Sequence, residues 1–229
     1  MVDGGGSGVP TVVLASGSPR RAAILRRLGI EPDVRPADVD ETVGAGESAA
    51  DLVERLATAK LTACADVPPP SSQPVLIIAA DTVVEVGGSI LGKPEGKADA
   101  ERMLALLSGR RHRVITGLAV GLLDSNEGGS PPLQVSARET TEVTFRTLDR
   151  ELTDWYVGTG EAFDKAGGYG IQGRGALLVD RVDGSYSNVV GLPVVALDEL
   201  CRSLGWPLHR FAGGPDGAPT AEAQAGVGA

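Results

Sequence analysis

Near its N-terminus the chain reads TVVLASGSPRRAAILRRLGI over residues 11–30. Thr11 to Ala15 form a short apolar, β-branched run, which predicts a buried strand. Pro19 predicts the start of a helix that reaches Leu28, and Gly29 predicts its end, because proline suits the first helical position and glycine the position after the last. The first unit of the chain is therefore a strand, a tight loop and a helix.

Hydrophobic periodicity and turn residues predict the remaining elements. Helices are expected over residues 48–65, 98–107, 149–157 and 195–204, and strands over residues 75–86, 90–91, 112–123, 133–148 and 176–182. Gly87 and Gly88 predict a hairpin turn between the first two of these strands. We expect residues 1–10 to be flexible, residues 11–211 to form one domain, and residues 212–229, rich in Gly, Ala and Pro, to be a disordered tail.

Composition excludes several classes of protein. The chain has 229 residues and a formal net charge of −9 at pH 7, which argues against a sequence-independent grip on nucleic acid. With 3% aromatic residues it has few platforms for base stacking. It has no run of about 18 apolar residues for a membrane span and no signal peptide. We therefore expect a cytoplasmic protein without nucleic-acid or membrane partners.

Arg20 and Arg21 stand where local electrostatics disfavours them. Both fall in the first turn of the predicted helix, where the helix dipole makes positive charge unfavourable by roughly a few tenths of a kcal/mol each. The preceding loop, residues 16–18, would let the backbone approach an anion, and an arginine fork would complete a phosphate cradle. The alternative is that both arginines are solvated surface residues.

Two lysines are further candidate ligands for an anion. Lys60 lies four residues after Leu56 and four before Cys64, so it falls on the apolar side of its predicted helix. It either extends to the rim of that face or points into a cleft. Lys93 follows the predicted hairpin, in a turn where a lysine is usually just exposed.

Asp81 interrupts the apolar run of residues 75–86. Burying a carboxylate there without a partner would cost on the order of several kcal/mol, so we expect Asp81 to bind a metal or to accept several hydrogen bonds. The alternative is a carboxylate that caps backbone amides at a strand end. Asp38, Asp40 and Glu41 add acidic oxygens that Mg²⁺ or Mn²⁺ could share with phosphate, although runs of acidic residues are more often solvated.

Residues 168–173, GYGIQG, match the dinucleotide-binding pattern letter by letter. That pattern needs a strand before it and a helix after it, and the predicted context here is the reverse. A loop whose glycines let the backbone approach a flat ligand, with Tyr169 or Gln172 beside it, explains the residues better. His112, at a predicted strand start, is interpreted as structural rather than as a general base.

Taken together, these residues resemble the Maf family of nucleotide pyrophosphatases. The similarity runs in order from residue 11 to about residue 204 and is carried by residues 14–21, 39–42, 56–60, 80–84, 91–94, 107–110, 116–117, 164–175 and 187–193. The resemblance implies an α/β fold with a mixed twisted sheet, helices on both sides and two lobes around a cleft, similar to the inosine triphosphate pyrophosphatases. It also implies a homodimer, and some members of the family have been linked to septum formation and cell-division arrest.

For the active site, the resemblance implies hydrolysis of a nucleoside triphosphate to a monophosphate and pyrophosphate. Asp81 would accept a proton from water, and Asp81 and Glu41 would hold Mg²⁺ or Mn²⁺. The triphosphate would be bound by the side chains of Ser16, Arg20, Lys60 and Lys93.

Three residues, Arg20, Thr82 and Gln172, resemble the pyrimidine branch of the family rather than the 7-methylguanosine branch. The amide of Gln172 offers both a donor and an acceptor, which fits the carbonyl and N–H edge of uracil or thymine. We expect dTTP and UTP to be the best substrates, with modified pyrimidine nucleotides also accepted. Two alternatives stay open, namely a 7-methyl-GTP pyrophosphatase and a nucleotide-binding regulator of septum formation with weak catalysis.

Overall fold

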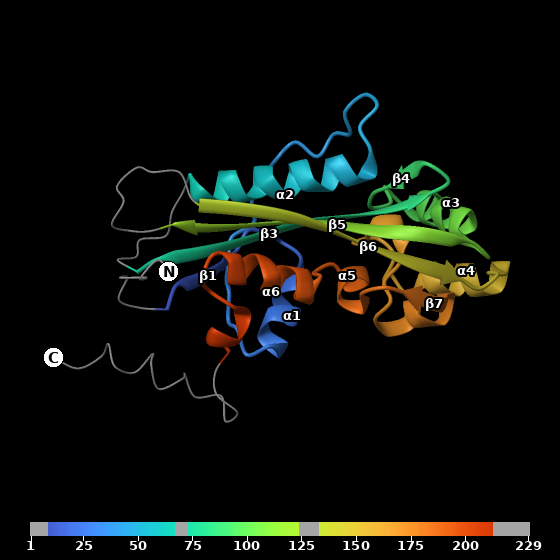
Figure 1. Ribbon diagram of the computed structural model, residues 1–229. Coiled ribbons are helices and arrows are strands. Elements are labelled where there is room, and N and C mark those ends of the chain that lie inside the picture. Colours follow the sequence, from blue (N-terminus) through green and yellow to red (C-terminus); the bar gives the residue numbers. More distant parts are fainter. Residues whose placement is uncertain (1–8, 67–72, 124–132, 213–229) are drawn as a thin grey trace.

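The computed structural model describes residues 9–66, 73–123 and 133–212 (Figure 1). The predicted disordered tail falls almost entirely outside these residues, as do the first eight residues of the predicted flexible N-terminus. No helix in the described part of the chain is both long and apolar enough to cross a membrane.

A seven-stranded mixed sheet forms the centre of the molecule. Its main path runs in the order β2 (Asp33–Val34), β1 (Thr11–Leu14), β3 (Val75–Val86), β5 (Arg111–Leu123), β6 (Leu133–Phe145) and β7 (Val179–Asp183), and β4 (Ser89–Leu91) pairs with β3 off this path. β1 is parallel to both of its neighbours, and the other pairs are antiparallel. The predicted class, a mixed sheet with flanking helices, is confirmed.

Helices cover both faces of this sheet (Figure 1). α2 (Ala49–Ala65) lies along one face, and α1 (Pro19–Arg27), α5 (Tyr186–Val190) and α6 (Val194–Ser203) lie on the other. α3 (Lys97–Leu107) and α4 (Arg150–Gly158) gather at the end of the sheet that carries β4 and β7. Three short 3-10 helices complete the described part, η1 (Ala166–Gly168), η2 (Gly173–Leu178) and η3 (Leu208–Arg210).

Local sequence explains how α2 is placed. Ser48 caps its first turn by accepting a hydrogen bond from the Asp51 N–H, and its buried residues recur at helical spacing. Gly117 lets the helix approach β5 closely, because a Cβ at this position would lie 2.2 Å from the Val53 carbonyl oxygen. The face of α2 that carries Lys60 is thereby pressed against the sheet.

The edge of β3 that faces β1 contains a gap. β1 pairs with β3 at residues 75–78, and β4 pairs with it at residues 84–86. Within the described part of the chain, no strand pairs with residues 79–83 on this edge, whereas β5 pairs with residues 75–85 on the other edge. Asp81 and Thr82 lie in the gap, and their side chains point to opposite faces because strand residues alternate.

The structure corrects two of the predicted strand boundaries and adds one strand and one α-helix. The strand predicted over residues 176–182 begins only at Val179, because η2 occupies residues 173–178, and the one predicted over 133–148 ends at Phe145. β2 and α5 were not predicted. Both are too short to show periodicity, and α5 is defined by a Ser185 cap and by Gly191, whose φ of 118° ends the helix.

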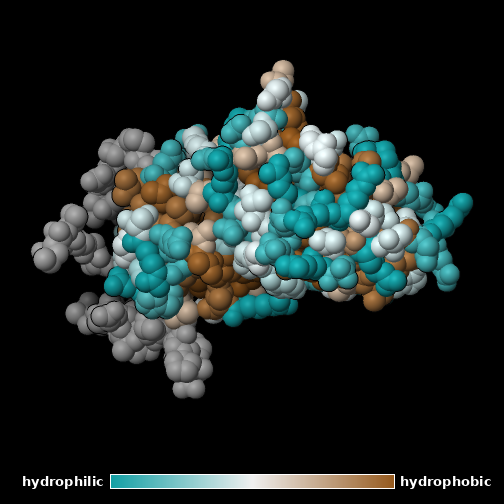
Figure 2. Space-filling model, turned by 45° about the vertical axis from the view of Figure 1, so that its right-hand side comes forward, coloured by the Kyte–Doolittle hydropathy of each residue, from teal (hydrophilic) through white to brown (hydrophobic). Residues whose placement is uncertain are grey.

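The surface is mostly hydrophilic on the face that Figure 2 shows, with separate hydrophobic patches between the polar side chains. Exposed large apolar residues come from several different elements, among them Leu133, Trp155, Leu177 and Val195. Scattered apolar residues of this kind are normal for a protein surface.

Candidate active site

A cavity of ≈ 750 Å³ opens at the gap in β3. Its lining includes eight side chains predicted from the sequence for catalysis, metal binding or substrate binding: Ser16, Arg20, Glu41, Lys60, Asp81, Thr82, Lys93 and Gln172. Asp38 and Asp40, the other two acidic candidates for the metal, are not part of this lining. Residues from both faces of the sheet line it, because no strand covers the edge at this point. Ligand sites in α/β sheets commonly lie where neighbouring strands diverge in this way.

Lys60 links the two predicted carboxylates. Its Nζ lies 2.6 Å from Asp81 Oδ1 and 2.6 Å from Glu41 Oε1. The side chains of Lys60 and Asp81 are 10% and 13% exposed, whereas that of Glu41 is 57% exposed. Of the two sequence interpretations of Lys60, the one in which it points into a cleft is therefore confirmed, and Asp81 has a charged partner rather than a capping role.

The pKa of Glu41 reflects this arrangement. Partial burial acts to raise it, but the hydrogen bond and positive charge of Lys60 outweigh burial and hold the pKa below its ordinary value, with smaller contributions from Lys93 and Arg21. Glu41 is therefore ionised at neutral pH and carries negative charge at the mouth of the cavity.

The donor set suits a cation that shares its ligands with a substrate. Asp81 and Glu41 each use one oxygen on Lys60, which leaves a second hard oxygen on each carboxylate. Among the residues described, no group of three or more His, Cys, Asp or Glu side chains is arranged to hold a metal. Two carboxylates completed by phosphate and water are the usual environment of Mg²⁺, so these residues fit Mg²⁺ or Mn²⁺ rather than a cage made only by protein.

Arg21 is buried and makes three hydrogen bonds. It donates to the Gly191 carbonyl at 2.7 Å, to Ser16 Oγ at 2.8 Å and to Thr82 Oγ1 at 2.9 Å. Burial lowers the pKa of its guanidinium, and the negative charge of Asp81 opposes that shift. Arg21 thus joins the loop before α1, the middle of β3 and the turn after α5.

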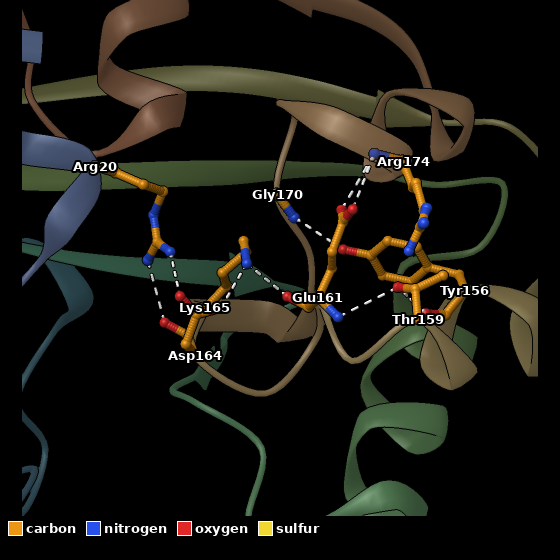
Figure 3. Close-up of polar contacts among 8 residues, drawn as sticks. All are labelled: Arg20, Tyr156, Thr159, Glu161, Asp164, Lys165, Gly170 and Arg174. Carbon is orange, nitrogen blue, oxygen red and sulfur yellow. Dashed lines mark hydrogen bonds and ion pairs between the residues drawn. The ribbon is translucent and has the colours of Figure 1, made fainter. Parts of the chain in front are cut away.

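Arg20, by contrast, lies at the mouth of the cavity (Figure 3). Its guanidinium donates to Asp164 Oδ2 at 2.5 Å and to the Asp164 carbonyl oxygen at 3.1 Å. The same carboxylate accepts from Lys165 Nζ at 2.5 Å. The interpretation of both arginines as solvated surface residues is therefore wrong, since one is buried and the other is paired across the cavity.

The Thr82 hydroxyl is engaged within the protein. It accepts from Arg21 and lies 2.9 Å from Thr116 Oγ1, in the next strand of the sheet. These two hydrogen bonds use two of the three hydrogen-bonding sites of the hydroxyl.

Lys93 and Gln172 lie on opposite segments of the cavity wall. Lys93 is exposed and has no ion-pair partner among residues 9–66, 73–123 and 133–212. The turn that carries it is held by a hydrogen bond from the Gly167 N–H to the Gly92 carbonyl. The Gln172 side chain makes no hydrogen bond within the same residues, so both groups can contact a ligand.

His112 lies outside the cavity lining, in the apolar cluster formed with α3 and α4. Its Nε2 is 2.7 Å from the Tyr169 hydroxyl, and its ring packs edge-on against Phe145. Burial lowers the pKa of His112 to about 4. Its place supports the structural role predicted from the sequence.

Two residues around the cavity, Glu161 and Asp164, were missed as site residues by the sequence reasoning, and Arg21, considered there as part of a phosphate cradle, was not predicted to be buried. For Arg21 the signal was available, because Leu25 lies four residues later on the buried face of α1. Glu161 and Asp164 lie in the segment after α4, where no periodicity indicates which way a side chain points.

Comparison of the amino-acid sequence with those of known proteins identifies a family and several relatives. A family model described as Maf-like protein matches residues 11–204. The chain is 49% identical over 199 residues to a dTTP/UTP pyrophosphatase of Anaeromyxobacter dehalogenans strain 2CP-C, covering 87% of this chain and 96% of the relative. It is 45% identical over 203 residues to a dTTP/UTP pyrophosphatase of Symbiobacterium thermophilum, covering 89% and 97%. A dTTP/UTP pyrophosphatase of Methylobacillus flagellatus is 46% identical over 194 residues, covering 85% and 92%.

Proposed function

The chain belongs to the Maf-like protein family, and from that premise we propose that it is a dTTP/UTP pyrophosphatase, which hydrolyses a nucleoside triphosphate to the monophosphate and pyrophosphate. The observation that carries the proposal is the cluster of Lys60, Asp81 and Glu41 in a cavity whose rim carries Lys93 and Arg20. Relatives that share nearly half of their residues with this chain bear the name of this activity.

In the proposed reaction, water attacks the α-phosphorus of the substrate. The bond from this phosphorus to the bridging oxygen breaks, and pyrophosphate leaves. Asp81 accepts a proton from the attacking water as a general base. Lys60 keeps the carboxylate turned toward the cavity.

Binding of the triphosphate is assigned to Ser16, Arg20, Lys60 and Lys93, whose hydroxyl and cationic groups line one cavity. Phosphoryl chemistry depends mainly on positioning and on stabilising charge, so a covalent nucleophile is not required. A Mg²⁺ or Mn²⁺ ion held by Asp81 and Glu41 would supply further stabilisation of charge on the phosphate oxygens.

Selection of the base is assigned to Gln172, with Arg20 and Thr82 as supporting residues. The Gln172 amide is free to donate and to accept, which matches the edge of uracil or thymine. We propose that the cavity is the cleft between two lobes of one domain over residues 11–211. A homodimer and a cytoplasmic location also remain predictions.

The test is a panel of nucleoside triphosphates with pyrophosphate release as the readout. Initial rates for dTTP, UTP, CTP and 7-methyl-GTP at one sub-saturating concentration should be highest for dTTP and UTP. A preference for 7-methyl-GTP would contradict the base assignment and leave pyrophosphatase activity standing. Nucleotide binding without any release of pyrophosphate would favour a regulator instead.

Asp81→Asn is the matched test of the catalytic role. The amide keeps the shape of the side chain but cannot take up the proton, so turnover should fall by at least about 10²-fold, as expected of an acid–base residue. Circular dichroism should stay native. Retention of more than about a tenth of wild-type activity would show that Asp81 is not the general base.

A further inference from the structure

The segment from Gly170 to Arg174 is held at both of its ends (Figure 3). It includes Gln172, which lines the cavity. Gln172 itself has extended backbone angles, φ −84° and ψ 153°, and lies directly before η2. Because its side chain makes no hydrogen bond in the described part of the chain, its position depends on what holds the backbone on either side.

The first anchor is Tyr156 of α4. Its hydroxyl accepts a hydrogen bond from the Gly170 N–H at 3.2 Å, and its side chain is fully buried. Gly175 also packs closely against this hydroxyl. A Cβ at position 175 would lie 3.0 Å from the Tyr156 hydroxyl and 2.0 Å from the Gly170 carbonyl oxygen, so the close approach requires glycine. The start of the segment is therefore tightly packed.

The second anchor is Glu161, which lies just after α4. Both of its carboxylate oxygens face the Arg174 N–H, at 3.3 and 3.2 Å. This N–H is one of the donors that the first turn of η2 leaves without an acceptor inside the helix, and η2 has no capping hydrogen bond from the Gln172 side chain. Glu161 therefore supplies the acceptor that Gln172 does not.

The backbone of Glu161 is itself fixed on both sides. Its N–H donates to Thr159 Oγ1 at 3.2 Å, and its carbonyl accepts from Lys165 Nζ at 2.6 Å. The Lys165 stem also packs against Gly170, since a Cβ there would lie 2.7 Å from Lys165 Cδ. The backbone that carries the Glu161 carboxylate is thus fixed, so the carboxylate can hold the turn that contains Gln172 in one position.

We propose that Glu161 is a positioning residue for base selection, which acts by accepting the Arg174 N–H and so fixing the Gln172 turn. The inference rests on the proposed function and extends it. It names Glu161, which does not contact the base, as a residue on which selection of the base depends. Preorganisation of this kind raises affinity by removing the cost of ordering the loop on binding.

The test compares Glu161→Ala with Glu161→Gln. Removal of the acceptor in Glu161→Ala should raise KM for dTTP and UTP about tenfold, as expected for loss of a charge-assisted hydrogen bond, with little change in kcat. Inhibition by inorganic pyrophosphate, which has no base, should be unchanged. Glu161→Gln keeps a carbonyl acceptor for the Arg174 N–H and should stay within about twofold of wild type.

A double-mutant cycle with Gln172→Ala distinguishes positioning from direct contact. If Glu161 acts through Gln172, the double variant should be no worse than the more affected single variant. Additive losses, or a Glu161→Gln variant as impaired as Glu161→Ala, would overturn the inference. Weakened pyrophosphate inhibition in Glu161→Ala would also overturn it, because the effect would then reach the phosphate subsite.

Two controls complete the experiment. Glu151 is exposed on α4, so Glu151→Ala should match wild type. If Glu161→Ala does not fold, Gly173→Ala perturbs the same contact from the other side, because its Cβ would lie 3.1 Å from Glu161 Oε1 and its φ is +68°. It should raise KM in the same way, and an unchanged KM would overturn the inference. A wild-type protein that hydrolyses neither dTTP nor UTP would instead overturn the proposed function, and this inference with it.

Discussion

Arg20 and Arg21 are neighbours in α1 but have different surroundings. Arg21 is buried and donates to three acceptors from three parts of the chain. Arg20 is 25% exposed, and its partner Asp164 is 57% exposed. We propose that a phosphate replaces Asp164 at Arg20 when substrate binds, whereas Arg21 has the structural role of holding Ser16 and Thr82.

Lysine substitutions should separate these two roles. Arg21→Lys cannot reproduce a three-way fork and should lower the free energy of unfolding by about 3 kcal/mol. Arg20→Lys loses the two-pronged contact with Asp164, which belongs to a partly solvated pair worth under about 1 kcal/mol, and should mainly raise KM for the triphosphate. Urea denaturation and steady-state kinetics of both variants check this. Equal stability of the two would contradict the structural role of Arg21.

At the scale of elements, the site depends on how α2 lies against the sheet. α2 carries Lys60, and the gap in the edge of β3 carries Asp81. The 2.6 Å contact between them requires the helix to approach β5 as closely as Gly117 allows. Packing of a helix on the central strands therefore determines the geometry of the Lys60–Asp81 ion pair, to which we assign the catalytic base.

Gly117→Ala should separate α2 from the sheet. The added methyl group would meet the Val53 carbonyl oxygen at 2.2 Å, and overpacking of this kind costs about 1–3 kcal/mol. Because Lys60 moves with the helix, turnover of dTTP should fall as well. Thermal unfolding and initial rates provide the measurement. Gly158→Ala is the control, since a Cβ there meets no atom within 4 Å, and a Gly117→Ala protein as stable as this control would refute the prediction.

At the scale of the whole molecule, the formal charge of the cavity lining differs in sign from that of the chain. The chain has a formal net charge of −9, yet the cavity is lined by five cationic side chains, Arg20, Arg21, Lys60, Lys93 and Lys165, and by four carboxylates, Glu41, Asp81, Glu161 and Asp164. The lining therefore has a formal charge of +1, which favours an anionic ligand in an otherwise acidic protein. Other carboxylates pair on the surface, as Glu47 does with Arg55, which lowers the pKa of Glu47 to about 2.

The stability of the molecule should fall as the pH drops from about 6.5 to about 4. Burial lowers the pKa of His112 from 6.5 to about 4, so in this interval the unfolded chain binds a proton that the folded chain does not. The contribution of His112 to the free energy of unfolding is therefore fully present above pH 6.5, its pKa in the unfolded chain, and is lost as the pH falls toward 4. It amounts to about 3 kcal/mol.

Urea denaturation at pH 7 and pH 5 tests this dependence. The chain has two histidines, and the other, His209, is exposed. His112→Gln should be less stable at pH 7 but should lose the decline between pH 7 and pH 5, whereas His209→Gln should keep it. A decline that persists in His112→Gln would assign the pH dependence to other groups.

Much of the local structure could be predicted from the sequence, because it depends on residues a few positions apart. The strand, loop and helix of residues 11–28, the Ser48 cap, the hairpin at Gly87 and Gly88, and the buried side of the helix that carries Lys60 all follow from spacing and turn chemistry. The need of Asp81 for a partner could also be predicted, since a charge within an apolar strand requires one.

The identity of those partners was decided only by the tertiary structure. Arg21 reaches the carbonyl of Gly191, 170 positions away, and Arg20 reaches Asp164, 144 positions away. Such contacts depend on strand order and on the gap in the edge of β3, which periodicity does not encode. The carboxylate of Glu161 illustrates the same limit, because its segment has no repeating pattern and only the fold brings it to the Arg174 N–H.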